Sequence, residues 1–203
     1  RFLFAKGDGV GPEIMDAVIF IIKAASAPVD YEEVSISDGK GRIRDELWDE
    51  LERTPVLLKG PTATPQGGGH QSLNVALRKN LGLFANVRPV RSFHPFVQSL
   101  HPKLDIVVIR ENEEDVYAGI EYQQTEDVTH GIKLATVQGC ERIVRYAFEY
   151  ARTNKRPKVT CLTKDNIMKI TDGLFSSTFK SVSAEFPDIQ ADHMIVDIGS
   201  ARL

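Results

Sequence analysis

The chain has 203 residues, of which 42% are hydrophobic and 26% charged, and its 25 basic and 28 acidic residues leave a formal charge of −3. This length can bury a substantial core, and the charge balance excludes the broad positive field that drives nonspecific nucleic-acid binding. No apolar run approaches the roughly 20 residues of a membrane-spanning helix, and the first residues lack the apolar length of a signal peptide. We therefore expect a cytosolic or matrix protein that builds any anion site locally. Cys140 and Cys161 are expected to be buried and to have no chemical role.

Short apolar runs bounded by turn residues alternate with longer segments of helical period, which is typical of an α/β protein with a substantially parallel sheet. The opening predicts the order β-α-β-α-β, and the three prolines within 89–102 predict an irregular segment. The expected strands are 2–5, 31–37, 56–58, 83–88, 104–110, 132–137, 158–162 and 193–198. The expected helices are 12–25, 45–53, 72–81, 142–152 and 166–183, the last being the longest.

A glycine-rich turn, Gly7-Asp8-Gly9-Val10-Gly11, follows the first expected strand and invites a dinucleotide-binding interpretation. The spacing is not Gly-x-Gly-x-x-Gly, and Pro12 has no amide hydrogen where the next donor would be needed. We therefore expect a tight strand-to-helix turn and no Rossmann fold.

The segment 59–78 is more informative, because a Gly-rich loop delivers the chain to a helix N-terminus that favours an anion. Ser72 supplies a hydroxyl at that terminus, and Asn74 and Arg78 share one helix face because they are four residues apart. Each residue alone also fits a structural role, such as an ordinary N-cap or an ion-pairing arginine.

Arg88 and Arg110 each end an expected strand, and ligands of open α/β sheets bind beyond the carboxyl ends of strands. We expect these two arginines to converge with Arg78. Planar guanidinium groups bind carboxylates in a bidentate manner, so three of them would suit a ligand with several carboxylates.

Five sequence blocks occur in order along nearly the whole chain. They are Gly7-Asp8-Gly9-Val10-Gly11-Pro12-Glu13, the loop from Lys59-Gly60-Pro61 to Gly69, Asn86-Val87-Arg88-Pro89-Val90, Arg110-Glu111-Asn112-Glu113-Glu114-Asp115-Val116-Tyr117-Ala118-Gly119 and Lys164-Asp165-Asn166-Ile167-Met168-Lys169. In these blocks the chain resembles the isocitrate/isopropylmalate dehydrogenase family of β-decarboxylating dehydrogenases.

The resemblance implies an α/β fold with a mixed sheet and flanking helices, arranged as two domains plus a clasp. Residues 1–85 would form the N-terminal part of the large domain, and 86–203 the small domain, with the clasp at about 115–138. The rest of the family fold has no counterpart here, and the missing Met and abrupt end predict a C-terminally incomplete chain.

The resemblance also implies roles for individual residues. Ser72 and Asn74 would bind isocitrate, and Arg78, Arg88 and Arg110 would hold its carboxylates. Tyr117 would protonate the carbon after decarboxylation, and Lys164 would help to remove the hydroxyl proton. Thr64 and Asn166 would contact the cofactor. Without the resemblance, Tyr117 would be interpreted as a half-buried strand aromatic and Lys164 as a solvated loop lysine.

The implied reaction is oxidative decarboxylation of isocitrate to 2-oxoglutarate, with hydride transfer to NAD or NADP and Mg or Mn as Lewis acid. The family's metal ligands and main cofactor segment are expected downstream of Leu203, so the 203 residues alone are expected to be inactive. The resemblance further implies a homodimer with shared active sites, in which Lys164 serves the partner's site, and no nucleic-acid or membrane partner.

Three alternatives remain open. The chain could belong to a sister enzyme acting on isopropylmalate, homoisocitrate or tartrate, and a selective loss of isocitrate binding in Ser72→Ala would argue against this. It could be a noncatalytic regulatory or polycarboxylate-binding subunit. A phosphate- or nucleic-acid-binding protein is the third, which the acidic balance disfavours.

Overall fold

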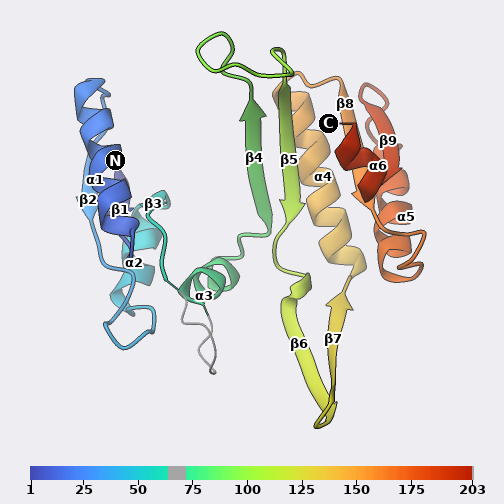
Figure 1. Cartoon of the computed structure of the whole chain (residues 1–203), viewed down its shortest axis with the longest axis horizontal. Coiled ribbons are helices and arrows are strands. Elements are labelled where there is room, and N and C mark those ends of the chain that lie inside the picture. The colour runs from blue at the N-terminus through green and yellow to red at the C-terminus, as the bar shows by residue number, and fades with distance from the viewer. Residues whose placement is uncertain (64–71, 203) are drawn as a thin grey trace. The chain divides into compact units, whose positions relative to one another are not determined.

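The computed structural model describes residues 1–63 and 72–202. They form two compact units, Arg1–Leu81 and Gly82–Leu203, whose elements are labelled in Figure 1. No helix among the described residues combines the length and apolar character that a membrane crossing requires. The mixture of parallel and antiparallel strands with flanking helices agrees with the predicted α/β class.

The first unit is a small parallel sheet covered by helices on both faces. Its strand order is β2-β1-β3, so the predicted β-α-β-α-β opening is confirmed. The strands are β1 (Phe2–Ala5), β2 (Tyr31–Glu33) and β3 (Leu57–Lys59), and the helices are α1 (Gly11–Ala24), α2 (Glu46–Arg53) and α3 (Leu73–Asn80).

The side chains of the central strand β1 alternate between the two faces of this sheet, as a strand requires. Leu3 packs with Leu47 of α2 and Leu77 of α3, whereas Phe4 packs with Met15 of α1. Leu3 and Phe4 are each only 1% exposed. The strand therefore fixes α1 on one face and α2 and α3 on the other.

The glycines after β1 serve close backbone packing. Gly7 has a φ of +75°, and a Cβ at Gly7 or Gly11 would overlap the Pro61 carbonyl. Asp8 N–H donates to the same carbonyl at 3.1 Å. Only glycine tolerates both the left-handed backbone and this approach, so the motif is the tight strand-to-helix turn predicted from its spacing.

The second unit contains three separate pairs of strands and three helices. β4 and β5 are antiparallel, β6 and β7 form a hairpin, and β8 and β9 are parallel. The strands are β4 (Ala85–Arg91), β5 (Asp105–Glu111), β6 (Asp115–Thr125), β7 (Val128–Leu134), β8 (Lys158–Thr163) and β9 (Gln190–Ile195). The helices are α4 (Val137–Thr153), α5 (Thr171–Ser183) and α6 (Val196–Ala201).

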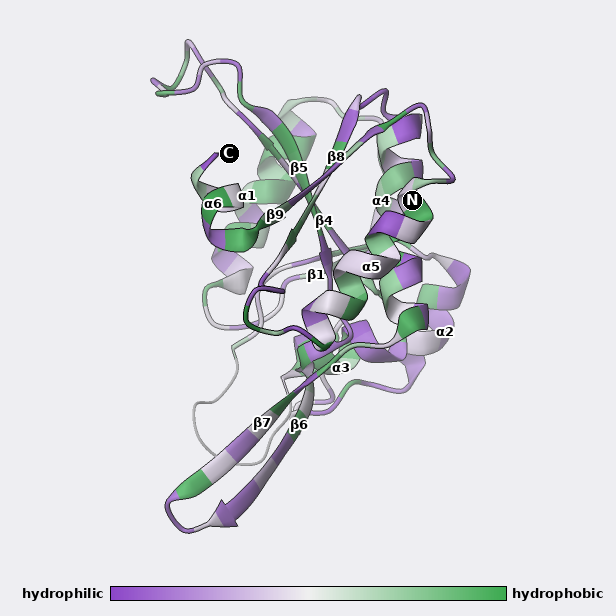
Figure 2. Cartoon of the chain, turned by 90° about the vertical axis from the view of Figure 1, so that its right-hand side faces the viewer, coloured by the Kyte–Doolittle hydropathy of each residue, from purple (hydrophilic) through white to green (hydrophobic). Residues whose placement is uncertain are grey.

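The core of this unit lies where α4 and α5 pack on each other and on β8. Phe148 of α4 is fully buried, and its ring lies 5.5 Å from that of Phe179 and 5.0 Å from that of Phe186. Cys161 of β8 belongs to the same cluster, while the next residue, Leu162, packs against Gly199 of α6. Figure 2 colours the ribbon by hydropathy and shows green, apolar segments on both α4 and α5.

Several predicted boundaries were wrong. The expected strand 31–37 ends at Glu33, and 193–198 ends at Ile195, after which Val196–Ala201 is helical. The helix expected from 166 begins only at Thr171, so α4, with 17 residues, is the longest described helix. Residues 165–170 form turns because the Lys164 carbonyl accepts the N–H groups of both Ile167 and Met168.

The hairpin was only partly predicted. The expected strand 132–137 is the end of β7, which finishes at Leu134, and its partner β6 was not read as a strand of its own. Most side chains of β6 and β7 are exposed on both faces, so the sequence lacks the alternation that marks a half-buried strand. Figure 1 shows the hairpin projecting from the rest of its unit, within the segment 115–138 expected to be a clasp.

Candidate functional site

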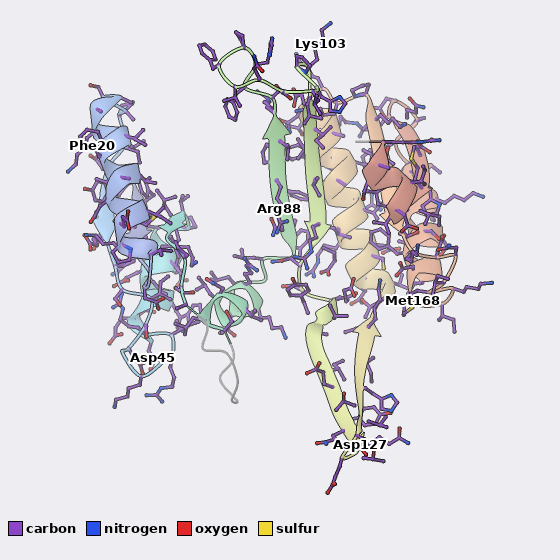
Figure 3. The ribbon with its side chains drawn as sticks, viewed as in Figure 1. Phe20, Asp45, Arg88, Lys103, Asp127 and Met168 are labelled. Carbon is purple, nitrogen blue, oxygen red and sulfur yellow. The ribbon has the colours of Figure 1, made fainter. Side chains whose placement is uncertain are left out.

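Arg88 and Arg110 lie on the same face of the β4–β5 pair. Arg110 is directly opposite Asn86, and Arg88 is two residues beyond Asn86 on β4, so all three side chains point to one side. Arg88 Nε donates to Asn86 Oδ1 at 3.2 Å. The interpretation of Arg88 as a strand end was wrong, since β4 continues to Arg91. Arg88 lies at the middle of the strand pair, opposite Val108, and Arg110 lies one residue pair from its end; Figure 3 labels Arg88 on β4.

Arg110 also contacts Tyr117. Its guanidinium carbon lies 4.1 Å from the centre of the Tyr117 ring, a geometry in which the cation and the ring attract each other. Tyr117 is 43% exposed, so its hydroxyl-bearing ring is accessible while one face is held by Arg110. The structure thus brings together the arginine expected to bind a carboxylate and the tyrosine expected to donate a proton, which the sequence named separately.

In the first unit, α3 carries the second group of predicted residues. Ser72 is its N-cap residue, and Asn74 and Arg78 are half-buried on the helix. Thr64 lies outside the described residues.

Lys59, at the end of β3, is a further cation that the sequence did not single out. Burial lowers the pKa of Lys59, and the positive charge of nearby Arg78 lowers it further. Two crowded cations repel each other and favour a bound anion between them. The position of Lys59 at the start of the Gly-rich loop, three residues before Thr62, was the sequence signal that could have identified it as a candidate.

Lys164 is held by two carboxylates. Its backbone N–H donates to Asp172 Oδ2 at 2.6 Å, and its ammonium group forms an ion pair with Asp197 of α6. The Lys164 side chain is 37% exposed outside any helix or strand, so the interpretation as a solvated loop lysine stays open beside the proton-transfer role. Asn166 is exposed on the turn that follows Lys164. Figure 3 labels Met168, which lies two residues further along the chain.

Asp172 is a functional candidate that the sequence did not identify. It is 5% exposed and forms an ion pair with Lys133 of β7. Burial alone would lower the pKa of Lys133, but the hydrogen bond that its ammonium group donates to Asp172 and the charge of Asp115 outweigh burial and raise the pKa. The neighbours of Asp172 come from separate parts of the chain, so no local pattern marks it.

A cavity of about 740 Å³ lies between β5 and β8 in this unit, and α4 and α5 line it as well. The described residues place no strand between β5 and β8. Cys140 and Cys161 line the cavity, and burial raises the pKa of these thiols to about 11 and about 12. The buried, unreactive state expected for both cysteines agrees with this environment.

We tested whether the described residues could hold a divalent metal. No group of three or more His, Cys, Asp or Glu side chains gathers with metal-binding geometry within 1–63 and 72–202. A hard cation needs several oxygen ligands, so these residues do not fit one, and we derive no step through a metal.

The geometry first defines a class: an α/β protein in which two arginines share one face of a strand pair and one of them lies against a tyrosine ring. The sequence profile of the isocitrate/isopropylmalate dehydrogenase family matches residues 2–203. The chain belongs to this family.

Relatives and solved structures agree with this assignment. The chain is 53% identical over 205 residues to an NADP isocitrate dehydrogenase of Rickettsia felis, covering 98% of this chain and 42% of that protein. It is 43% identical to subunit 2 of a mitochondrial NAD isocitrate dehydrogenase of Saccharomyces cerevisiae, covering 96% and 53%. The crystal structure of the TT0538 protein from Thermus thermophilus matches all of this chain with a TM-score of 0.90 at 43% identity, and 42% of that chain is covered. The chain therefore spans less than half the length of its Rickettsia relative.

Proposed function

We propose that this chain supplies the isocitrate-binding and proton-handling part of an NAD- or NADP-dependent oxidative decarboxylase. The single observation that carries the proposal is the contact of Arg110 with Tyr117, with Arg88 on the same sheet face. Support comes from relatives named as NADP and NAD isocitrate dehydrogenases. Bacterial and mitochondrial names among them support a cytosolic or matrix location.

The residues divide the work by their chemistry. Arg88 and Arg110 bind substrate carboxylates through charge-assisted hydrogen bonds, and Ser72, Asn74 and Arg78 bind the remaining polar groups. A nicotinamide cofactor would supply the acceptor for the hydride of the hydroxyl-bearing carbon. Lys164 helps to remove the hydroxyl proton. After the β-carboxylate leaves as CO₂, Tyr117 donates a proton to the carbon that carried it.

Titration calorimetry with isocitrate tests the proposal, with isopropylmalate as the control ligand. We expect isocitrate to bind in preference, and Ser72→Ala to weaken isocitrate selectively because it removes a hydroxyl hydrogen bond. Binding of isopropylmalate in preference would move the proposal to a sister enzyme. Absence of binding by either ligand would refute it.

An assay of reduced-cofactor absorbance with isocitrate, Mn or Mg, and NAD or NADP tests turnover. Since the described residues offer no three-ligand metal group, we expect residues 1–203 alone to show no turnover. Turnover by this chain would contradict that expectation and would identify the cofactor.

We also propose that two copies pair through the β6–β7 hairpin and share active sites, with Lys164 serving the partner's site. Ile120 and Ile132 face each other across the hairpin, and both are exposed, at 41% and 43%. A two-stranded hairpin is marginally stable in water, so a second copy that covers this pair would stabilise it. Sedimentation should show a dimer that Ile120→Lys dissociates, whereas the nearby Gln123→Lys should not; a wild-type monomer would refute the pairing.

A further inference from the structure

Lys133 lies between two carboxylates that come from distant parts of the second unit. Its Nζ is 3.5 Å from Asp115 Oδ2 and forms an ion pair with Asp172 Oδ1. The side chain of Lys133 is 25% exposed and that of Asp172 only 7%. A carboxylate this buried is costly unless it is paired, so Lys133 neutralises a charge that the fold has taken out of water.

Each carboxylate adjoins a residue with a proposed role in proton transfer. Asp115 is two residues before Tyr117 on β6. Asp172 accepts the backbone N–H of Lys164 at 2.6 Å. The Lys164 carbonyl accepts N–H groups from the following turn, so the backbone of Lys164 is held on both sides.

The backbone at Asp115 is strained, which is a second and independent observation. Asp115 has a φ of +59°, which is uncommon for a residue with a Cβ, and the register of the hairpin shifts between Asp115 and Ile120. Asp115 Oδ1 accepts the N–H of Val116 at 2.7 Å, while Oδ2 faces Lys133. Strain of this kind persists only where the surroundings hold it, and the ion pair with Lys133 is a contact that does so.

We propose that Lys133, through Asp115 and Asp172, is a positioning residue that fixes the Tyr117 strand relative to the Lys164 turn within one chain. Lys133 itself transfers no proton. The inference rests on the proposed roles of Tyr117 and Lys164, and its first test is independent of them.

The test measures hydrogen exchange of the Val116 and Lys164 amides by NMR on the ¹⁵N-labelled chain. Lys133→Met should accelerate both amides by about tenfold, because each loses the ion pair that holds its acceptor. Lys133→Arg keeps the charge and should restore protection. The double variant Lys133→Met with Asp172→Asn removes both charges, so no buried charge is left unpaired, and the asparagine side chain at position 172 still offers an acceptor to the Lys164 N–H. Because the ion pair is lost here too, the double variant should show the same acceleration.

Asp188→Asn is the matched control, since it cuts the ion pair with Arg152 in the same unit. It should leave both amides unchanged. Unchanged exchange in the folded double variant, or equal acceleration by Asp188→Asn, would overturn the proposal.

A second experiment measures kcat and KM in any form of the protein that oxidises isocitrate. There, Lys133→Met should lower kcat by about tenfold while KM stays within about threefold, because Tyr117 in its own site and Lys164 in the partner's site both lose their fixed placement while carboxylate binding does not change. Equal losses in kcat and 1/KM would overturn a positioning role. The exchange measurement needs no substrate. A failure of isocitrate to bind would therefore count against the proposed function and not against the bridge, by which we mean the ion pairs of Lys133 with Asp115 and Asp172.

Discussion

Replacement of Arg110 by alanine is the sharpest test of the proposed ligand site. Arg110→Ala removes a guanidinium that lies 4.1 Å from the Tyr117 ring and faces the same side as Arg88. Hydrogen bonds between charged groups contribute about 1.5–3 kcal/mol, and each 1.4 kcal/mol corresponds to about tenfold in affinity. We therefore expect the Kd for isocitrate to rise by roughly 10- to 100-fold.

Calorimetric titration of the variants against wild type measures this effect. Arg110→Lys should lie in between, since it keeps the charge but loses the planar fork and much of the contact with the ring. Arg91→Ala is the matched control, because Arg91 lies at the other end of the same strand pair and binds Asp105 at 3.2 Å. Wild-type affinity in Arg110→Ala, or an equal loss in Arg91→Ala, would refute the assignment of the sheet face with Arg88 and Arg110 as the carboxylate site.

Three further predictions concern side chains whose burial affects their reactivity or the stability of their unit. Cys140 and Cys161 should react with a thiol reagent only on unfolding, because burial raises the pKa of these thiols to about 11 and about 12; rapid labelling of the native chain would contradict this. Lys59→Met should stabilise the first unit at neutral pH. The folded-state pKa of Lys59 lies below its ordinary 10.5, so wild-type stability should rise with pH up to about 10.5, and the advantage of the variant in chemical denaturation should shrink over that range. Phe148→Ala should lower the free energy of unfolding of the second unit by about 3–5 kcal/mol, since the ring is fully buried; a loss below about 1 kcal/mol in urea denaturation would show that the aromatic cluster is not its core.

The elements that were predictable are those whose pattern reflects burial. The continuous apolar run Phe2–Ala5 and the turn residues that bound each run identified the opening order, and the five ordered blocks identified the family. The hairpin and the start of α5 were misread for a physical reason. The exposed strands of the hairpin show no burial pattern. The turns before α5, in which the Lys164 carbonyl accepts two N–H groups, carry apolar residues at the same spacing as a helix.

By itself the sequence determined the α/β class and the family, and it named the residues proposed to bind and protonate a ligand, because these inferences depend on local periodicity and on short motifs. Only the tertiary structure showed the contact of Arg110 with Tyr117 and the bridge from Asp115 through Lys133 to Asp172. The three bridge residues are spread over the range 115–172, and their charges meet only when β6, β7 and α5 pack together. A contact between groups so far apart in the chain leaves no local signal, since each residue alone has the same appearance as an ordinary surface charge.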